Sequence, residues 1–247
     1  QQMLEEAAVS RRNLAELELQ QGHLDSAIEQ ANKAEILFRE REDWRGLADA
    51  GLLRVQALLA AHAEADARKG LAELAKPIAQ ASTEQRGIAA LLQAEFADRA
   101  KDRATSIKAS AQARQLAGAS GVKQLQLQVA LRDPQSHRDL DRDTATLGNV
   151  PLRLQWLAIA TRRALEHNQT AAAVTTYREA LSLLRHGDTL TAVELHALGT
   201  RAYAAGGDAV RATEADEAMR TALQQLQSHV PQNLRANFVA AQSAKGK

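Results

Sequence analysis

The sequence contains no cysteine, and proline and glycine are scarce, with four and 13 residues in 247. Without cysteine the chain can form no disulfide, no zinc–thiolate site and no thiol nucleophile. A fold of many β-strands needs more turn residues than these prolines and glycines supply. Aromatic residues make up only 3% of the chain, too few for a core filled by rings. These absences argue against an all-β fold and against an ordinary α/β enzyme.

The chain also lacks an excess of charge of one sign, because it has 31 basic and 30 acidic residues. The lysines and arginines do not cluster, and binding to a polyanion by counterion release needs such a cluster. No apolar run approaches the ~18 residues of a membrane-spanning helix. We therefore expect neither nucleic-acid binding nor a direct membrane span.

What the sequence does contain is helix-forming residues in amphipathic order. Hydrophobic residues are 45% of the chain, which argues against disorder, and alanine and leucine, both strong helix formers, are abundant. Apolar residues recur at helical spacing, and short turn signals interrupt them, for example at Gly22 and at Gly206-Gly207. Because the loops are short, neighbouring helices must be antiparallel.

One pattern recurs along the chain. A small residue is followed seven residues later by a turn residue and then by an alanine of the next helix. The clearest copies are Ala15–Gly22–Ala27, Thr161–Asn168–Ala173 and, with one extra residue, Gly199–Gly206–Ala212. Small residues let two helices approach, and the turn residue must tolerate a left-handed φ. With weaker copies anchored at Ala65 and Ala104, the alanines are 38, 39, 69 and 39 residues apart.

This pattern resembles the tetratricopeptide repeat, a tandem array of antiparallel helix pairs. The best matches are Leu14 to Ala34, Ala160 to Leu181 and Leu198 to Ala212, although the spacing is longer than the usual 34 residues and most signature aromatics are replaced. The resemblance implies an all-α fold, a right-handed α-solenoid of about six antiparallel helix–turn–helix hairpins. We expect a single elongated domain over residues 1–247, with a degenerate unit at about 118–150.

The last stretch of the chain differs from the hairpins. Pro231 interrupts it, and Leu234, Phe238 and Val239 form a short apolar stripe. We expect a capping helix at about 232–243 that covers the last hairpin, because terminal repeats need a polar outer face. A helix that docks onto a partner is the alternative.

No pattern of catalytic or metal-binding residues stands out. The seven histidines form no His-Glu-x-x-His pair. Asp139, Asp141 and Asp143 alternate as in a calcium loop, but the glycine and the closing glutamate of such a loop are missing. Ser120 and Lys123 match Ser-x-x-Lys without the other motifs of that enzyme class. We expect no enzymatic activity, no metal and no cofactor.

In tetratricopeptide proteins the first helices of successive hairpins line a concave groove that holds a peptide or a segment of a partner. The resemblance therefore implies a non-catalytic scaffold or adaptor that binds a partner protein or peptide. The groove residues implied by the resemblance are Arg12, Glu16, Arg54, Gln93, Phe96, Arg162, His196, Thr200 and Tyr203.

Two other interpretations stay open. The first is a periplasmic assembly factor or lipoprotein, and the second is the sensory or regulatory repeat domain of a larger bacterial signalling protein. The start at Gln1-Gln2-Met3 fits a mature form after signal cleavage as well as a trimmed chain. A chain without cysteine suits export, so a periplasmic location, exported or lipid-anchored, is preferred to the cytoplasm. The sequence identifies neither the partner nor the oligomeric state.

Overall fold

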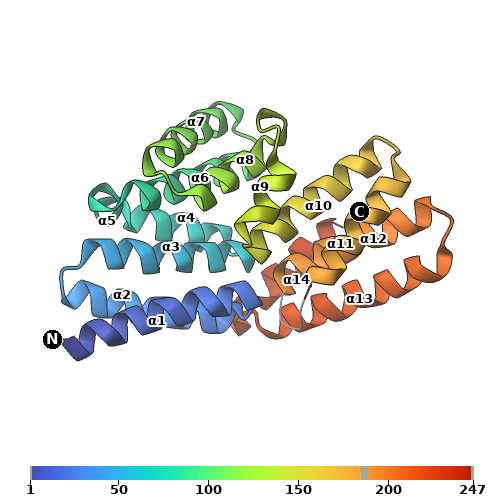
Figure 1. The fold of residues 1–247 in the computed structure, drawn as a ribbon. Helices are drawn as coiled ribbons and strands as arrows, with labels where there is room; N and C mark the ends of the chain where they lie inside the picture. The colour runs from blue at the N-terminus through green and yellow to red at the C-terminus, as the bar shows by residue number, and fades with distance from the viewer. Residues whose placement is uncertain (1, 185–188, 246–247) are drawn as a thin grey trace. The chain divides into compact units, whose positions relative to one another are not determined.

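A computed structural model describes residues 2–184 and 189–245 of the chain. Within these residues the backbone forms fourteen α-helices and two short 3-10 segments, and no strand (Figure 1). The prediction of an all-α fold is confirmed. The chain divides into two compact units, and we describe each by itself.

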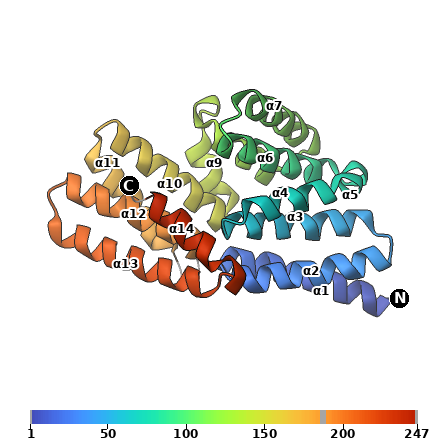
Figure 2. The ribbon, with the colours of Figure 1, turned by 180° about the vertical axis from the view of Figure 1, so that it is seen from behind.

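Unit 1 comprises Gln1–Val129 together with His229–Lys247. Within each of its hairpins the two helices lie side by side and run in opposite directions, as Figures 1 and 2 show. Its helices are α1 (Gln2–Gln21), α2 (Leu24–Glu40), α3 (Trp44–Ala60), α4 (Glu64–Glu73), α5 (Ala75–Gln80), α6 (Thr83–Arg99), α7 (Arg103–Ser120), the larger part of α8 (Lys123–Arg132), the 3-10 segment η2 (Gln232–Leu234) and α14 (Arg235–Lys245). The hairpin α1–α2 contacts α3 through both of its helices, and the hairpins α3–α4 and α6–α7 contact each other through α3 with α6 and α4 with α6.

Unit 2 comprises Ala130–Ser228. Beyond the end of α8 it contains η1 (Pro134–Ser136), α9 (Leu140–Leu147), α10 (Val150–Glu166), α11 (Thr170–Leu183), α12 (Thr189–Ala205) and α13 (Ala209–Ser228). In the hairpins α10–α11 and α12–α13, α12 contacts both α10 and α11. Around the predicted degenerate unit at about 118–150 the helices are short, since α8 has ten residues and α9 has eight.

Six of the helix-to-helix turns share one backbone conformation. In each, a residue with positive φ donates its N–H to the carbonyl three residues back at 2.9–3.2 Å, and the next residue donates to the carbonyl five residues back at 2.8–3.0 Å. This is the Schellman motif, which satisfies the last carbonyls of a helix. The residues in the left-handed conformation are Gly22, Glu42, His62, Lys101, Asn168 and Gly207.

These turns define the repeat more accurately than the sequence pattern does. Inside the hairpins they lie at residues 22, 62, 101, 168 and 207, and the residue five positions later is buried or half-buried. That residue is Ala67 in the second hairpin and Ser106 in the third, both buried. The anchors predicted at Ala65 and Ala104 are wrong by two residues, because both of these alanines are exposed.

The last hairpin also differs from the predicted pattern. Its left-handed residue is Gly207, not Gly206, so Ala212 follows at the regular five residues and no extra residue is inserted. The sequence could not separate the two, because either glycine tolerates a positive φ.

The segment after Pro231 is helical, as expected, and within unit 1 the chain from His229 onward contacts the first two hairpins. The Asp25 N–H donates to the His229 carbonyl at 2.8 Å, and the Phe238 ring lies 5.5 Å from the His62 ring. The predicted cap over the last hairpin stays a prediction. The apolar stripe is buried at the ends of α1–α2 and α3–α4. The prediction of one domain over residues 1–247 stays a prediction.

Among the described residues, no helix is both long enough and apolar enough to cross a bilayer.

The turns generate a prediction about stability. Lys101 is exposed and has φ = +58°. A left-handed conformation costs a residue with a Cβ atom about 1–2 kcal/mol, and glycine avoids that cost. Lys101→Gly should therefore raise the free energy of unfolding by about 1 kcal/mol, measured by urea denaturation.

Lys108, exposed within α7, is the matched control for this substitution. Lys108→Gly places glycine in a helix interior and should lower the free energy of unfolding by about 1 kcal/mol. Equal effects of the two substitutions would contradict the assignment of the turn.

Candidate functional site

The first helices of unit 1 enclose a polar hollow of about 240 Å³, which we call the A-helix groove. Four helices, α1, α3, α6 and α8, contribute side chains to it. The lining residues are Arg12, Glu16, Asp49, Leu52, Leu53, Gln56, Ser82, Glu84, Gln85, Ile88, Gln124, Leu125 and Gln128. These helices lie far apart in sequence and form the groove only because the hairpins stack through their first helices.

The repeat explains which residues reach the A-helix groove. Arg12 and Leu52 lie ten residues before the left-handed turn residue of their hairpins, and Glu16 and Gln56 lie six before it. Positions four residues apart share one helix face because a turn takes 3.6 residues. The first two hairpins therefore contribute equivalent positions to the groove, whereas α6 contributes residues nearer its start, Glu84, Gln85 and Ile88.

Arg12 ties two first helices together. Its Nε donates to Asp49 Oδ2 at 2.5 Å, and its Nη1 donates to Glu16. Burial, the largest single effect, would lower the pKa of Arg12, but hydrogen bonds and attraction to Asp49 and Glu16 together raise it. The guanidinium holds α1 against α3 and brings these carboxylates to the groove.

The rest of the polar lining consists of glutamine amides and one more carboxylate. Gln85 belongs to a capping box with Ser82 and also donates to the Arg45 carbonyl at 3.0 Å. An amide both donates and accepts hydrogen bonds, as a peptide group does. With one guanidinium (Arg12) and three carboxylates (Glu16, Asp49 and Glu84), the formal charge of the lining is 1 − 3 = −2.

Of the groove residues predicted in unit 1, only Arg12 and Glu16 line the A-helix groove. Arg54 donates to Glu35 Oε1 of α2 at 2.5 Å and lies 3.7 Å from Glu73 of α4. Gln93 and the buried Phe96 line a different hollow between α4 and α7. Arg54 and Gln93 stand eight residues before their turns, about 200° around the helix from the positions six before.

In unit 2, Arg162 stands six residues before the turn at Asn168, the position of Glu16 and Gln56. It is exposed and forms an ion pair with Glu194, which joins α10 to α12 as Arg12–Asp49 joins α1 to α3. Arg162 is therefore the predicted residue of unit 2 that matches the groove positions of unit 1.

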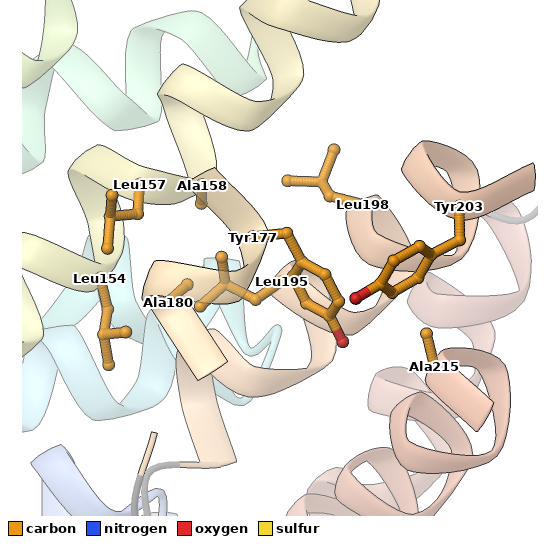
Figure 3. Packing of buried hydrophobic residues seen from close by; sticks show 9 residues of the cluster. All are labelled: Leu154, Leu157, Ala158, Tyr177, Ala180, Leu195, Leu198, Tyr203 and Ala215. Carbon is orange, nitrogen blue, oxygen red and sulfur yellow. The ribbon is translucent and has the colours of Figure 1, made fainter. Parts of the chain in front are cut away.

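The other residues predicted in unit 2 belong to its core or lie beside it (Figure 3). Tyr203 is buried and meets the Tyr177 ring edge-on, with 5.7 Å between ring centroids. Tyr177 Oη lies 2.8 Å from His196 Nδ1, and the Thr200 hydroxyl donates to the His196 carbonyl. Their predicted role in binding stays a prediction, and their contacts are those of core packing.

Burial controls the Tyr177–His196 hydrogen bond. Desolvation, with a smaller contribution from Tyr203, raises the pKa of Tyr177 to about 12. Desolvation also lowers the pKa of His196, so the imidazole is neutral near pH 7. The phenol therefore donates and the imidazole Nδ1 accepts.

Sequence reasoning missed a polar cluster in unit 2. Arg153 is buried in α10, and it donates through Nη1 to Asp141 Oδ1 at 2.8 Å and through Nε to Glu179 Oε1 at 2.9 Å. Trp156 Nε1 donates to the same Asp141 oxygen at 2.7 Å. Asp141, the middle one of the three alternating aspartates, thus serves the packing of α9, α10 and α11. Within the described ranges, no three histidine or acidic side chains are placed to share a metal ion.

Comparison with known proteins adds no relative: no family model, no curated protein and no solved structure matches the chain.

Gly199 generates a prediction about the core of unit 2. A Cβ added there would lie 2.2 Å from Tyr177 Cζ, and the ring is held between His196 and Tyr203. Gly199→Ala should lower the free energy of unfolding by about 1–3 kcal/mol, as overpacking does. Thermal and urea denaturation measure the change.

Gly118→Ala is the control, because a Cβ at this helical glycine meets nothing within 4 Å. It should be neutral or stabilising by up to about 1 kcal/mol. A Gly199→Ala variant as stable as the Gly118→Ala variant would show that Tyr177 does not occupy this position.

The Asp141 cluster predicts a dependence on pH. Burial, the largest effect, would raise the pKa of Asp141, but hydrogen bonds from Trp156 and Arg153 bring it below the ordinary 3.8. A carboxylate with a lowered pKa stabilises the fold while it is ionised. Its contribution is present above pH 3.8 and is lost as the pH falls through the lower folded pKa. The contribution is about 1 kcal/mol or less, because Asp141 is 70% exposed and screened by solvent.

Urea unfolding of the wild-type chain and of Asp141→Asn measures this effect. A Trp44→Phe background leaves Trp156 as the reporter of unit 2, since the chain has two tryptophans. The stability difference between the two proteins should shrink as the pH is lowered from about 5 to about 3. A difference that stays constant over this range would contradict the role given to the Asp141 carboxylate.

Proposed function

We propose that the protein is a non-catalytic scaffold of the tetratricopeptide type that binds a segment of a partner protein. The observation that carries this proposal is the A-helix groove, a polar hollow lined jointly by the first helices of successive hairpins. The turn spacing of 39–40 residues between adjacent hairpins supports a repeat architecture. The contacts of α1 with α3, α3 with α6, and α10 with α12 support stacking of successive hairpins, as the proposed right-handed α-solenoid requires.

The chemistry of the lining favours a polar, basic segment. The formal charge of −2 attracts lysine or arginine side chains. Gln56, Gln124 and Gln128 offer amides that can bond to the N–H and C=O groups of an extended chain. A volume of about 240 Å³ has room for one or two side chains of that segment rather than for a large organic ligand.

A peptide-selection experiment tests this function. A library of random peptides of about ten residues would be selected on the immobilised full chain, and enriched peptides would be measured by isothermal titration calorimetry. We expect enrichment of basic peptides with dissociation constants of about 1–100 μM. Gln128→Trp fills the groove and should weaken binding by about tenfold or more.

Gln115→Trp is the matched control, because Gln115 is an exposed glutamine of α7 outside the groove. It should bind the selected peptides as the wild type does. The proposal fails if no peptide is enriched, or if Gln128→Trp and Gln115→Trp bind the peptides equally.

A further inference from the structure

A second groove of unit 1 is lined in part by the chain's own C-terminal segment. This hollow, the tail groove, has a volume of about 300 Å³ and lies among α2, α3 and α4, with Pro231 and, from η2, Asn233 and Leu234 in its wall. Leu234 is 6% exposed, and the flanking Val230 and Phe238 are 0% and 1% exposed. Apolar residues four positions apart thus anchor the segment on unit 1.

The next hairpin repeats this groove. Aligned on the turns at residues 22, 62 and 101, positions of α2 move by 40 residues onto α4, and positions of α3 and α4 move by 39 onto α6 and α7. The shift carries Asn32 to Ala72, Arg54 to Gln93 and Asp66 to Thr105. These three destinations line a hollow of about 660 Å³ bounded by α4, α5, α6 and α7, which we call the open groove.

Three further residues of the tail groove obey the same shift and show how the chemistry changes. Leu58 becomes Ala97, so the floor is deeper; Ile28 becomes Arg68, which adds a positive charge; and Glu73 becomes Gln112, which removes a carboxylate. The open groove is therefore the tail groove one repeat later, enlarged and more basic. Ala75, Ile78 and Ala79 of α5 lie in its wall and have no counterpart in the tail groove, and no described residue outside residues 68–112 lines it.

The charges at the open groove indicate what would enter it. Its charged lining residues are Arg68, Arg86 and Asp102, a formal charge of 2 − 1 = +1. Arg68 is paired with Glu64. Arg86 donates to the Thr83 hydroxyl at 3.2 Å, and no carboxylate of the described residues lies within ion-pair distance of it. An acidic group on the occupant would supply the missing partner, and guanidinium groups bind carboxylates well.

We infer that the open groove binds a segment of another protein built like the tail, with apolar anchors four residues apart and an acidic residue beside them. The apolar anchors would cover the alanine-rich floor, and the carboxylate would pair with Arg86. This site is separate from the A-helix groove, because it uses Arg86, Ala89 and Gln93 of α6, whereas that groove uses Gln85 and Ile88 on another face of the helix.

The probe is a fluorescein-labelled peptide with the sequence of residues 229–241, carrying Glu in place of Arg235, together with the unaltered peptide. Fluorescence anisotropy with the full chain measures both affinities. We expect the acidic peptide to bind more tightly, by about tenfold, and Arg86→Glu to reverse this order. Arg86 is exposed, so the variant should fold, which circular dichroism checks.

Ala72→Trp should block the open groove and abolish binding, since Ala72 is an exposed residue of its wall. The matched control is Ala111→Trp, at the equivalent exposed position of the next hairpin, outside the groove. Binding that survives Ala72→Trp, or that shows no preference for the acidic peptide, overturns the inference. Gln128→Trp alters the A-helix groove and should leave binding of the acidic peptide to the open groove unchanged. The experiment therefore tests the open groove separately from the proposed function of the A-helix groove.

Discussion

The left-handed residue that closes each helix pair is the constraint on which the rest of the structure depends. One positive φ, with two backbone hydrogen bonds to the end of the preceding helix, reverses the chain within a few residues. Each step along a helix turns the side chain by about 100°, so the position of this residue decides which side chains face the neighbouring helix. Four of the six turns hold a residue other than glycine, which shows that packing of the two helices outweighs the local cost.

The same constraint produces two kinds of hollow in unit 1. In the first two hairpins, positions six and ten residues before the turn line the polar A-helix groove, together with residues of α6 and α8. Positions eight before a turn, such as Arg54 and Gln93, face the space between second helices, where the tail groove and the open groove lie. Polar pairing dominates the first kind of hollow, and small apolar residues dominate the open groove. A repeat thus offers the same geometry several times, with the side chains free to differ.

Unit 2 is held differently, by buried polar and aromatic contacts. The Arg153 guanidinium of α10 bonds to Asp141 of α9 and to Glu179 of α11, and so joins the three helices. The Tyr177 ring fills the space beside Gly199, and its hydroxyl donates to His196. Alanine-rich helix interfaces bury little apolar surface, and these contacts add geometric specificity. They account for several residues whose sequence pattern resembles functional positions but whose contacts are structural.

The sequence by itself determined the helical class, the hairpins and the approximate repeat, because helical periodicity and turn residues act over a few positions of the chain. It also placed Arg12 and Glu16 in the A-helix groove. It placed the repeat anchors at Ala65 and Ala104 instead of Ala67 and Ser106, and the last turn at Gly206 instead of Gly207. Alanines are so frequent in these helices that a shift of one or two residues gives a similar pattern. Only the tertiary structure decided that the C-terminal segment packs on the first hairpins and that Asp141 meets Arg153. Such contacts join residues far apart in sequence, and local propensity carries no information about them.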